Sequence, residues 1–100
     1  MILARDIARA VARVYDIAPE DLKTPSRFPP LPEAKHVAFW LSHRIGGISI
    51  TQTGRRFSHH HTTVMYGLRQ IDKRRRLEPA FAEHLFDLVQ DVREGVDGAE

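Results

Sequence analysis

The chain has 100 residues, enough for one small domain with a single core, and its 42 % hydrophobic content is typical of a globular protein. It has no cysteine, which excludes disulfide scaffolds, thiolate metal sites and cysteine nucleophiles. No apolar run approaches the roughly 20 residues that cross a bilayer, and charged residues come too early for a signal peptide, so we expect a cytoplasmic protein.

The charges are distributed unevenly along the chain. Residues 1–34 are neutral overall, residues 35–76 hold nine basic side chains and one acidic one, and residues 77–100 hold one basic and seven acidic ones. The basic middle is where a polyanion would dock. Composition alone equally allows these charges to do no more than solvate helix surfaces.

The first third of the chain alternates helical patterns with a connector. Residues 3–15 have apolar side chains at spacings of three and four, which predicts an amphipathic helix with Leu3, Ile7, Ala10, Val11 and Val14 inward. Residues 19–22 predict one short helical turn that begins with proline. Residues 24–32 contain four prolines, which favours an extended, rigid connector.

Pro32 is predicted to begin a helix over residues 33–45, with Trp40 as a core residue and Gly46-Gly47 at its end. Ser49 then caps a short helix to about Arg56, with Gly54 where two helices would cross closely.

The segment from Ser58 to Arg76 predicts a long helix, with Ser58 as its N-cap and Val64, Leu68 and Ile71 inward. A short helix, a turn at Phe57-Ser58 and this longer, more basic helix describe a helix-turn-helix.

A last amphipathic helix with an acidic outer face is predicted by Phe81, Leu85, Leu88, Val89 and Val92. Gly95 and Gly98 indicate a frayed end. We therefore expect an all-α, compact helical domain over residues 1–94, followed by a flexible tail at 95–100.

Three consecutive histidines, His59 to His61, raise the possibility of a metal site. Zinc ligands on a helix usually lie at i and i+4, whereas consecutive residues point about 100° apart. No acidic side chain lies close in sequence to complete a shell. We expect no metal, no cofactor and no catalytic constellation. A purely structural alternative for one of the three, His61, is that it caps or packs at the helix start.

At a helix N-terminus the same groups suit DNA. His60 and His61 can donate hydrogen bonds to guanine or phosphate, and Thr62 and Thr63 can contact thymine methyl groups or phosphates. The basic residues 73–76 lie about 15–20 Å further along the helix. They either reach a flanking phosphate or pair with the acidic last helix.

Phe57 followed by Ser-His-His-His-Thr-Thr-Val, and then Gly67-Leu68-Arg69-Gln70-Ile71, resembles the signature of the C-terminal DNA-binding domain of the bacterial chromosomal replication initiator DnaA. The similarity spans about residues 3–92. It implies a Trp-repressor-like helical fold that binds DnaA-box-type double-stranded DNA. It also implies that His61, Thr62 and Thr63 enter the major groove, while a basic loop reaches the minor groove with arginine.

The chain departs from that pattern at three places. Ser58-His59-His60 replaces Gly-Arg-Asp, so an imidazole stands where the family has an acceptor for cytosine. The minor-groove arginine position falls near Pro29-Pro30, with only Arg27 nearby, and Ala34-Lys35-His36 replaces Pro-Arg-Gln. These departures should weaken or re-target recognition.

We predict a nucleoid-associated regulator or replication accessory factor. We expect it to be non-enzymatic, because no Gly-x-x-x-x-Gly-Lys-Ser/Thr motif for nucleotide binding is present. The divergent motif and the start at Met1 favour a stand-alone relative. An alternative is a protein-interaction module that retains this fold but has lost or weakened DNA binding, and that docks a partner through the proline-rich loop or the acidic last helix. The expected DNA contacts are Arg27, Lys35, Ser49, His59, His60, His61, Thr62, Thr63, Tyr66 and Arg69.

Overall fold

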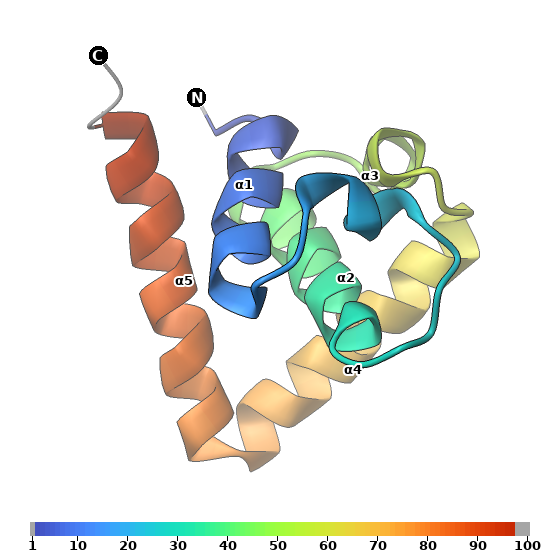
Figure 1. Cartoon of the computed structure of the whole chain (residues 1–100). Coiled ribbons are helices and arrows are strands. Elements are labelled where there is room, and N and C mark those ends of the chain that lie inside the picture. The colour runs from blue at the N-terminus through green and yellow to red at the C-terminus, as the bar shows by residue number, and fades with distance from the viewer. Residues whose placement is uncertain (1, 98–100) are drawn as a thin grey trace.

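The computed structural model describes residues 2–97, which contain helices and no strand (Figure 1). The five α-helices are α1 (Ala4–Tyr15), α2 (Leu31–Trp40), α3 (Ile50–Phe57), α4 (His61–Leu77) and α5 (Pro79–Asp97). A short helical turn, η1 (Pro19–Lys23), follows α1, and a wider π-helical turn, η2 (Leu41–Ile45), extends α2. The all-α prediction is confirmed. None of the helices in this part of the chain combines the length and apolarity needed to span a membrane.

Helix α2 lies at the centre of the domain, where α4 crosses it, while α1 and α5 pack together along another side (Figure 1). Every helix contributes to one core, whose fully buried side chains include Ile7, Val11, Leu22, Val37, Phe39, Leu41, Val64, Ile71, Leu85, Leu88 and Val92. The inward faces predicted for α4 and α5 are thus confirmed. In α1, Val14 is 40 % exposed instead, and the neighbouring Tyr15 packs against the core.

The helix-turn-helix is present, but its turn differs from the prediction. Ser49 caps α3 as expected, since its Oγ accepts a hydrogen bond from the Gln52 amide at 3.1 Å. Ser58 does not cap α4. Its backbone is left-handed (φ 58°), so it ends α3, and the N-cap of α4 is His60. The turn therefore consists of Ser58, His59 and His60.

Gly54 is needed by this turn rather than by a helix crossing. The His59 amide donates to the Gly54 carbonyl at 2.9 Å, and a Cβ on Gly54 would lie 2.5 Å from the His59 carbonyl oxygen. The turn backbone lies directly on α3 at the one position without a side chain.

The last helix continues past its predicted end. Helix α5 runs through Gly95 to Asp97, because one glycine costs a helix about 1 kcal/mol without stopping it. Residues 98–100, including Gly98, lie outside the described residues.

The C-terminal half of α4 is fixed to α2 by polar contacts. The Trp40 indole N–H donates to Asp72 at 2.8 Å, and Arg44 pairs with the same carboxylate at 2.6 Å. Burial opposes ionisation of Asp72, but the bonds from Trp40 and Arg44 and the nearby arginine charges lower its pKa. Trp40 is a buried core residue, as predicted, and it also fixes where α4 lies.

A second network joins four helices at the far end of α4. Arg74 pairs with Glu33 of α2 and Glu78, and its guanidinium lies 3.8 Å from the centre of the Phe81 ring of α5. The Tyr15 hydroxyl of α1 donates to Glu33 at 2.6 Å. Burial raises the pKa of Tyr15 far above its usual value, and the bond to Glu33 adds to that effect.

Candidate nucleic-acid interface

The first two turns of α4 present polar and aromatic side chains to solvent. His61, Thr62, Thr63 and Tyr66 are exposed, while Val64 on the opposite side is fully buried. Gly67 allows this end of α4 to lie close to α2, since a Cβ there would be 2.8 Å from the His36 ring. The end of the helix is therefore held firmly by its inner face and open on its outer face.

The three consecutive histidines have three different roles. His59 is half-buried; its Nε2–H donates to the Leu22 carbonyl at 3.0 Å, and its ring lies edge-on to Phe39. This contact fixes the turn to η1. His60 caps α4, since its Nδ1 accepts from the Thr62 amide at 3.3 Å and from the Thr62 hydroxyl at 2.8 Å.

His61 is the first residue of α4 and is exposed, so the structural alternative, in which it caps or packs at the helix start, does not hold. The left-handed Ser58 ends α3 and shifts the helix start, which gives the capping role to His60. The rings of His60 and His61 lie 4.2 Å apart between centroids. Residues 2–97 contain no group of three histidine or carboxylate side chains that could hold a metal ion.

A groove of about 710 Å³ separates this end of α4 from the loop at residues 24–30. Arginine, lysine, histidine and hydroxyl groups line it, and no lining residue is acidic; the lining includes Ser26, Arg27, Lys35, His36, His59, Thr62, Thr63 and Tyr66. Six of the ten predicted contacts thus meet in one groove. His60 and His61 lie beside it at the helix start, while Ser49 and Arg69 are exposed outside it.

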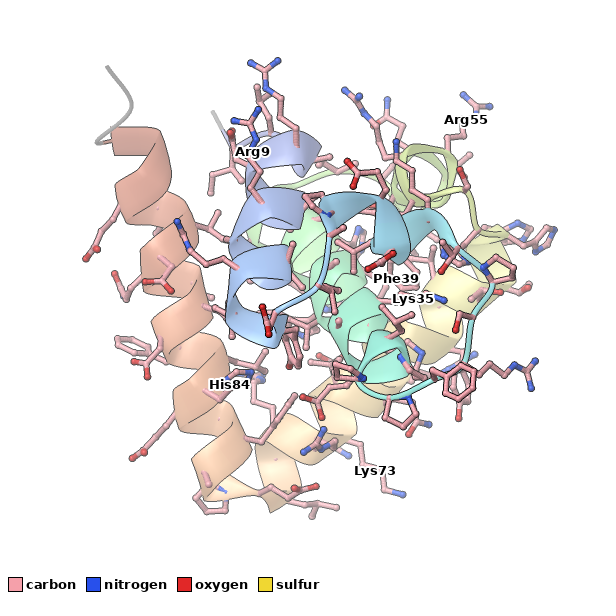
Figure 2. All side chains as sticks on the ribbon, viewed as in Figure 1. Arg9, Lys35, Phe39, Arg55, Lys73 and His84 are labelled. Carbon is pink, nitrogen blue, oxygen red and sulfur yellow. The ribbon has the colours of Figure 1, made fainter. Side chains whose placement is uncertain are left out.

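Lys35 lies at the bottom of the groove rather than on the outer surface. The residue is 7 % exposed, and its ammonium donates to the Ser26 carbonyl at 2.7 Å, which holds the loop against α2. Figure 2 shows Lys35 and Phe39 on the side of α2 that faces the loop. Burial, and then the charge of Arg27, lower the pKa of Lys35.

His36 also lines the groove, although it is not among the contacts expected from the sequence. Burial lowers its pKa, as do the charges of Lys35 and His59, so the ring stays neutral at physiological pH. Its ring lies edge-on to Tyr66 with centroids 5.6 Å apart. The signal in the sequence was its spacing, because Pro32, Lys35, His36 and Phe39 follow the helical repeat and all line the groove.

Two of the four basic residues at positions 73–76 contact other parts of the protein. Arg74 forms the network with Glu33 and Glu78, and Arg75 lies over the Trp40 ring at 5.8 Å. Lys73 points away from the body of the protein (Figure 2). We expected residues 73–76 either to reach a flanking phosphate or to pair with the acidic last helix. Arg74 does form ion pairs, but its partners are Glu33 of α2 and Glu78, which precedes α5, and not the acidic face of α5.

Comparison with known proteins agrees with this geometry. Residues 4–71 match the family described as the bacterial dnaA protein helix-turn-helix. The chain is 32 % identical over 91 residues to a chromosomal replication initiator protein DnaA from Mycobacteroides abscessus, covering 91 % of this chain. It is also 32 % identical over 83 residues to a protein of the same name from Ruegeria sp., covering 82 % of this chain.

In both relatives the matched part is 18 % of their own length. The match includes α1 to α3 and most of α4. The chain belongs to the bacterial DnaA helix-turn-helix family, a membership that supports DNA binding as its general function.

Proposed function

We propose that this domain binds double-stranded DNA sequence-specifically, with the first turns of α4 in the major groove. The observation that carries the proposal is the row of exposed His61, Thr62, Thr63 and Tyr66 beside a groove without acidic lining. A major groove about 12 Å wide admits an α-helix, and its base edges offer partners for imidazole, hydroxyl and methyl groups.

Different groups would read bases and hold phosphates. His61 and Thr63 are exposed at the helix start and suited to base edges, while Ser49 and Arg69 are suited to phosphates. His60 keeps its Nε2–H for DNA, since its Nδ1 already accepts from Thr62. An imidazole donor here supports a target that has diverged from a DnaA box.

The biological role would be that of a regulator or accessory factor at DnaA-box-like or diverged sites on the nucleoid. Two of the matched relatives carry the name chromosomal replication initiator protein, and this sequence has no nucleotide-binding Gly-x-x-x-x-Gly-Lys-Ser/Thr motif. We therefore assign it no ATPase activity.

A selection from random duplexes tests the proposal. We expect one enriched motif, bound with an affinity that falls steeply with salt, with a log–log slope near −4 to −5 for about five neutralised phosphates. A pool that shows no enrichment, together with binding that does not depend on salt, would refute it.

A second candidate function is protein interaction through α5. Phe86 is 61 % exposed on that helix, beside the exposed carboxylates of Glu83 and Asp87. An aromatic side chain between acidic groups suits a basic, apolar protein surface. As an alternative to the first function, this one supposes that DNA binding has been lost. It therefore predicts an unenriched pool, and the duplex selection separates the two functions.

A further inference from the structure

A second hollow lies away from the groove, where α1, η1 and the end of α3 meet. Its volume is about 250 Å³, and it shares no lining residue with the groove. Four basic side chains and one acidic one surround it. The lining of this basic pocket consists of Ala4, Arg5, Ala8, Arg9, Pro19, Glu20, Lys23, Arg56 and Phe57.

The basic pocket combines an apolar floor with open cations around it. Ala4 and Phe57 are buried and bring no polar side-chain group to the floor. All four of its basic side chains are exposed. Among the described residues, no carboxylate forms an ion pair with any of the four. The pocket therefore suits an apolar side chain that is flanked by carboxylates.

The chain presents such a group on the outer face of α5. Phe86 is 61 % exposed, and the carboxylates of Glu83 and Asp87 are exposed as well. Glu83 lies three residues before Phe86 and four before Asp87, so it neighbours both on the helix surface. Neither carboxylate forms an ion pair within the described part of the chain. These three residues are the Phe86 patch. Elsewhere on the helix, Asp91 and Glu94 add acidic charge and Arg93 is its one basic side chain.

The basic pocket and the Phe86 patch match in charge and in polarity. A buried phenylalanine removes about 150–250 Å² from water, and opposite charges around it fix the register of an interface and disfavour other partners. Since Phe86 is exposed, the two patches do not meet within one chain.

We propose that Phe86 of one copy enters the basic pocket of a second copy of this chain, where Glu83 and Asp87 pair with the surrounding arginine and lysine side chains. Neither patch uses a residue of the groove, so this self-association does not require that DNA binding be lost. One aromatic anchor with a few ion pairs makes a small interface, and small interfaces are weak and transient.

Sedimentation of the full chain in the absence of DNA tests this contact. Between about 10 µM and about 1 mM protein, the weak part of the affinity scale, we expect the average mass to rise above that of one chain. Added salt should reduce the association, because salt screens exposed charges. Arg9→Glu and Phe86→Ala should each associate about 30-fold more weakly, the effect of losing a central interface residue.

A mixture of the two variants separates this contact from other kinds of association. Arg9→Glu keeps its Phe86 patch and Phe86→Ala keeps its basic pocket, so an equimolar mixture should form pairs that neither variant forms alone. Arg13→Glu reverses a charge on α1 outside the pocket, and Leu77→Ala removes an exposed hydrophobic side chain from the end of α4. Both controls should associate as the parent does, and melting curves check that all four variants are folded.

A parent that stays at the mass of one chain up to about 1 mM would overturn the self-association, since specific complexes form well below this concentration. An associating parent whose two variants form no pairs when mixed would overturn it as well. A parent of single-chain mass in which Arg9→Glu weakens duplex binding would show that the basic pocket holds DNA instead of a second copy.

Discussion

The two ends of α4 both carry side chains suited to DNA, but they differ in what those side chains already contact. At the N-terminal end, His61 and Thr63 are exposed and held up by a buried inner face. At the C-terminal end, Arg74 is paired with two carboxylates and lies over Phe81. We therefore propose that the DNA-reading surface lies at the N-terminal end of α4 and not where arginine is most frequent. A cation that is already paired stabilises the fold, and open donors at a capped helix start are left for DNA.

The largest expected effect on DNA affinity comes from removing the exposed side chains at the N-terminal end of α4. The double variant His61→Ala/Thr63→Ala should bind the enriched duplex about 100-fold more weakly, because each lost base contact is worth about 1–3 kcal/mol. Its thermal unfolding should match the parent, since both side chains are exposed. Fluorescence anisotropy and a melting curve measure the two quantities. Unchanged affinity would mean that this end does not read DNA.

The variant Gly54→Ala tests whether the turn at residues 58–60 positions the N-terminal end of α4. A Cβ at this position would lie 2.5 Å from the His59 carbonyl oxygen, so the turn must move. We expect a loss of about 1–3 kcal/mol in the free energy of unfolding, as for other overpacked sites. DNA affinity should fall as well, because His60 and His61 move with the turn. Gly95→Ala, where a Cβ would meet nothing within 4 Å, is the matched control for urea denaturation.

Arg74→Ala tests the other end. Its ion pairs are partly exposed, and with the contact to Phe81 they should contribute about 1 kcal/mol to the free energy of unfolding. Affinity for the duplex should change little, because the guanidinium is already occupied. Arg76→Ala, at an exposed neighbouring position, should leave the stability as it is. A loss of DNA affinity in Arg74→Ala larger than in the double variant at His61 and Thr63 would reverse the roles of the two ends.

The smallest expected effect is on the pH dependence of stability. It concerns His36 of α2, which packs against the N-terminal half of α4. Burial, then the charges of Lys35 and His59, lower its folded-state pKa below the ordinary value of 6.5. The unfolded chain therefore takes up the proton first. The stability that comes from neutral His36 is fully present above about pH 6.5 and is lost as the pH falls below it.

Urea denaturation at pH 7.5 and pH 5.5 measures this effect. His36→Gln should show a smaller decrease in stability over that range than the parent does. The range stays above the titration of Glu33 and Asp72, whose pKa values lie below their ordinary ones. An identical decrease in the two proteins would show that protonation of His36 does not contribute to this pH dependence.

Much of the fold followed from the sequence, because helical periodicity, proline and capping serine act locally. The Ser49 cap of α3 and the core faces of α4 and α5 are examples. The turn at residues 58–60 could not be predicted from the sequence, since a serine such as Ser58 suits both an N-cap and a left-handed helix end. Only the contact between Gly54 and the His59 backbone decides between the two.

The candidate site was predicted only in part, because some of its features are local in sequence and others depend on distant residues. His61, Thr62 and Thr63 were found from their place at a helix start, and the structure leaves them exposed. The inward role of His59, the buried position of Lys35 and the pairing of Arg74 depend on residues distant in sequence, namely Leu22, Ser26 and Glu33. No local pattern contains those contacts.

The most direct test of the comparison is a titration of ¹⁵N-labelled protein with the enriched duplex, followed by the backbone amide shifts. We predict the largest changes at His61 to Tyr66, with further changes at Ser49 and Arg27, and little change at residues 73–77. Large changes at residues 73–77 with none at His61 to Tyr66 would contradict the assignment of DNA reading to the N-terminal end of α4.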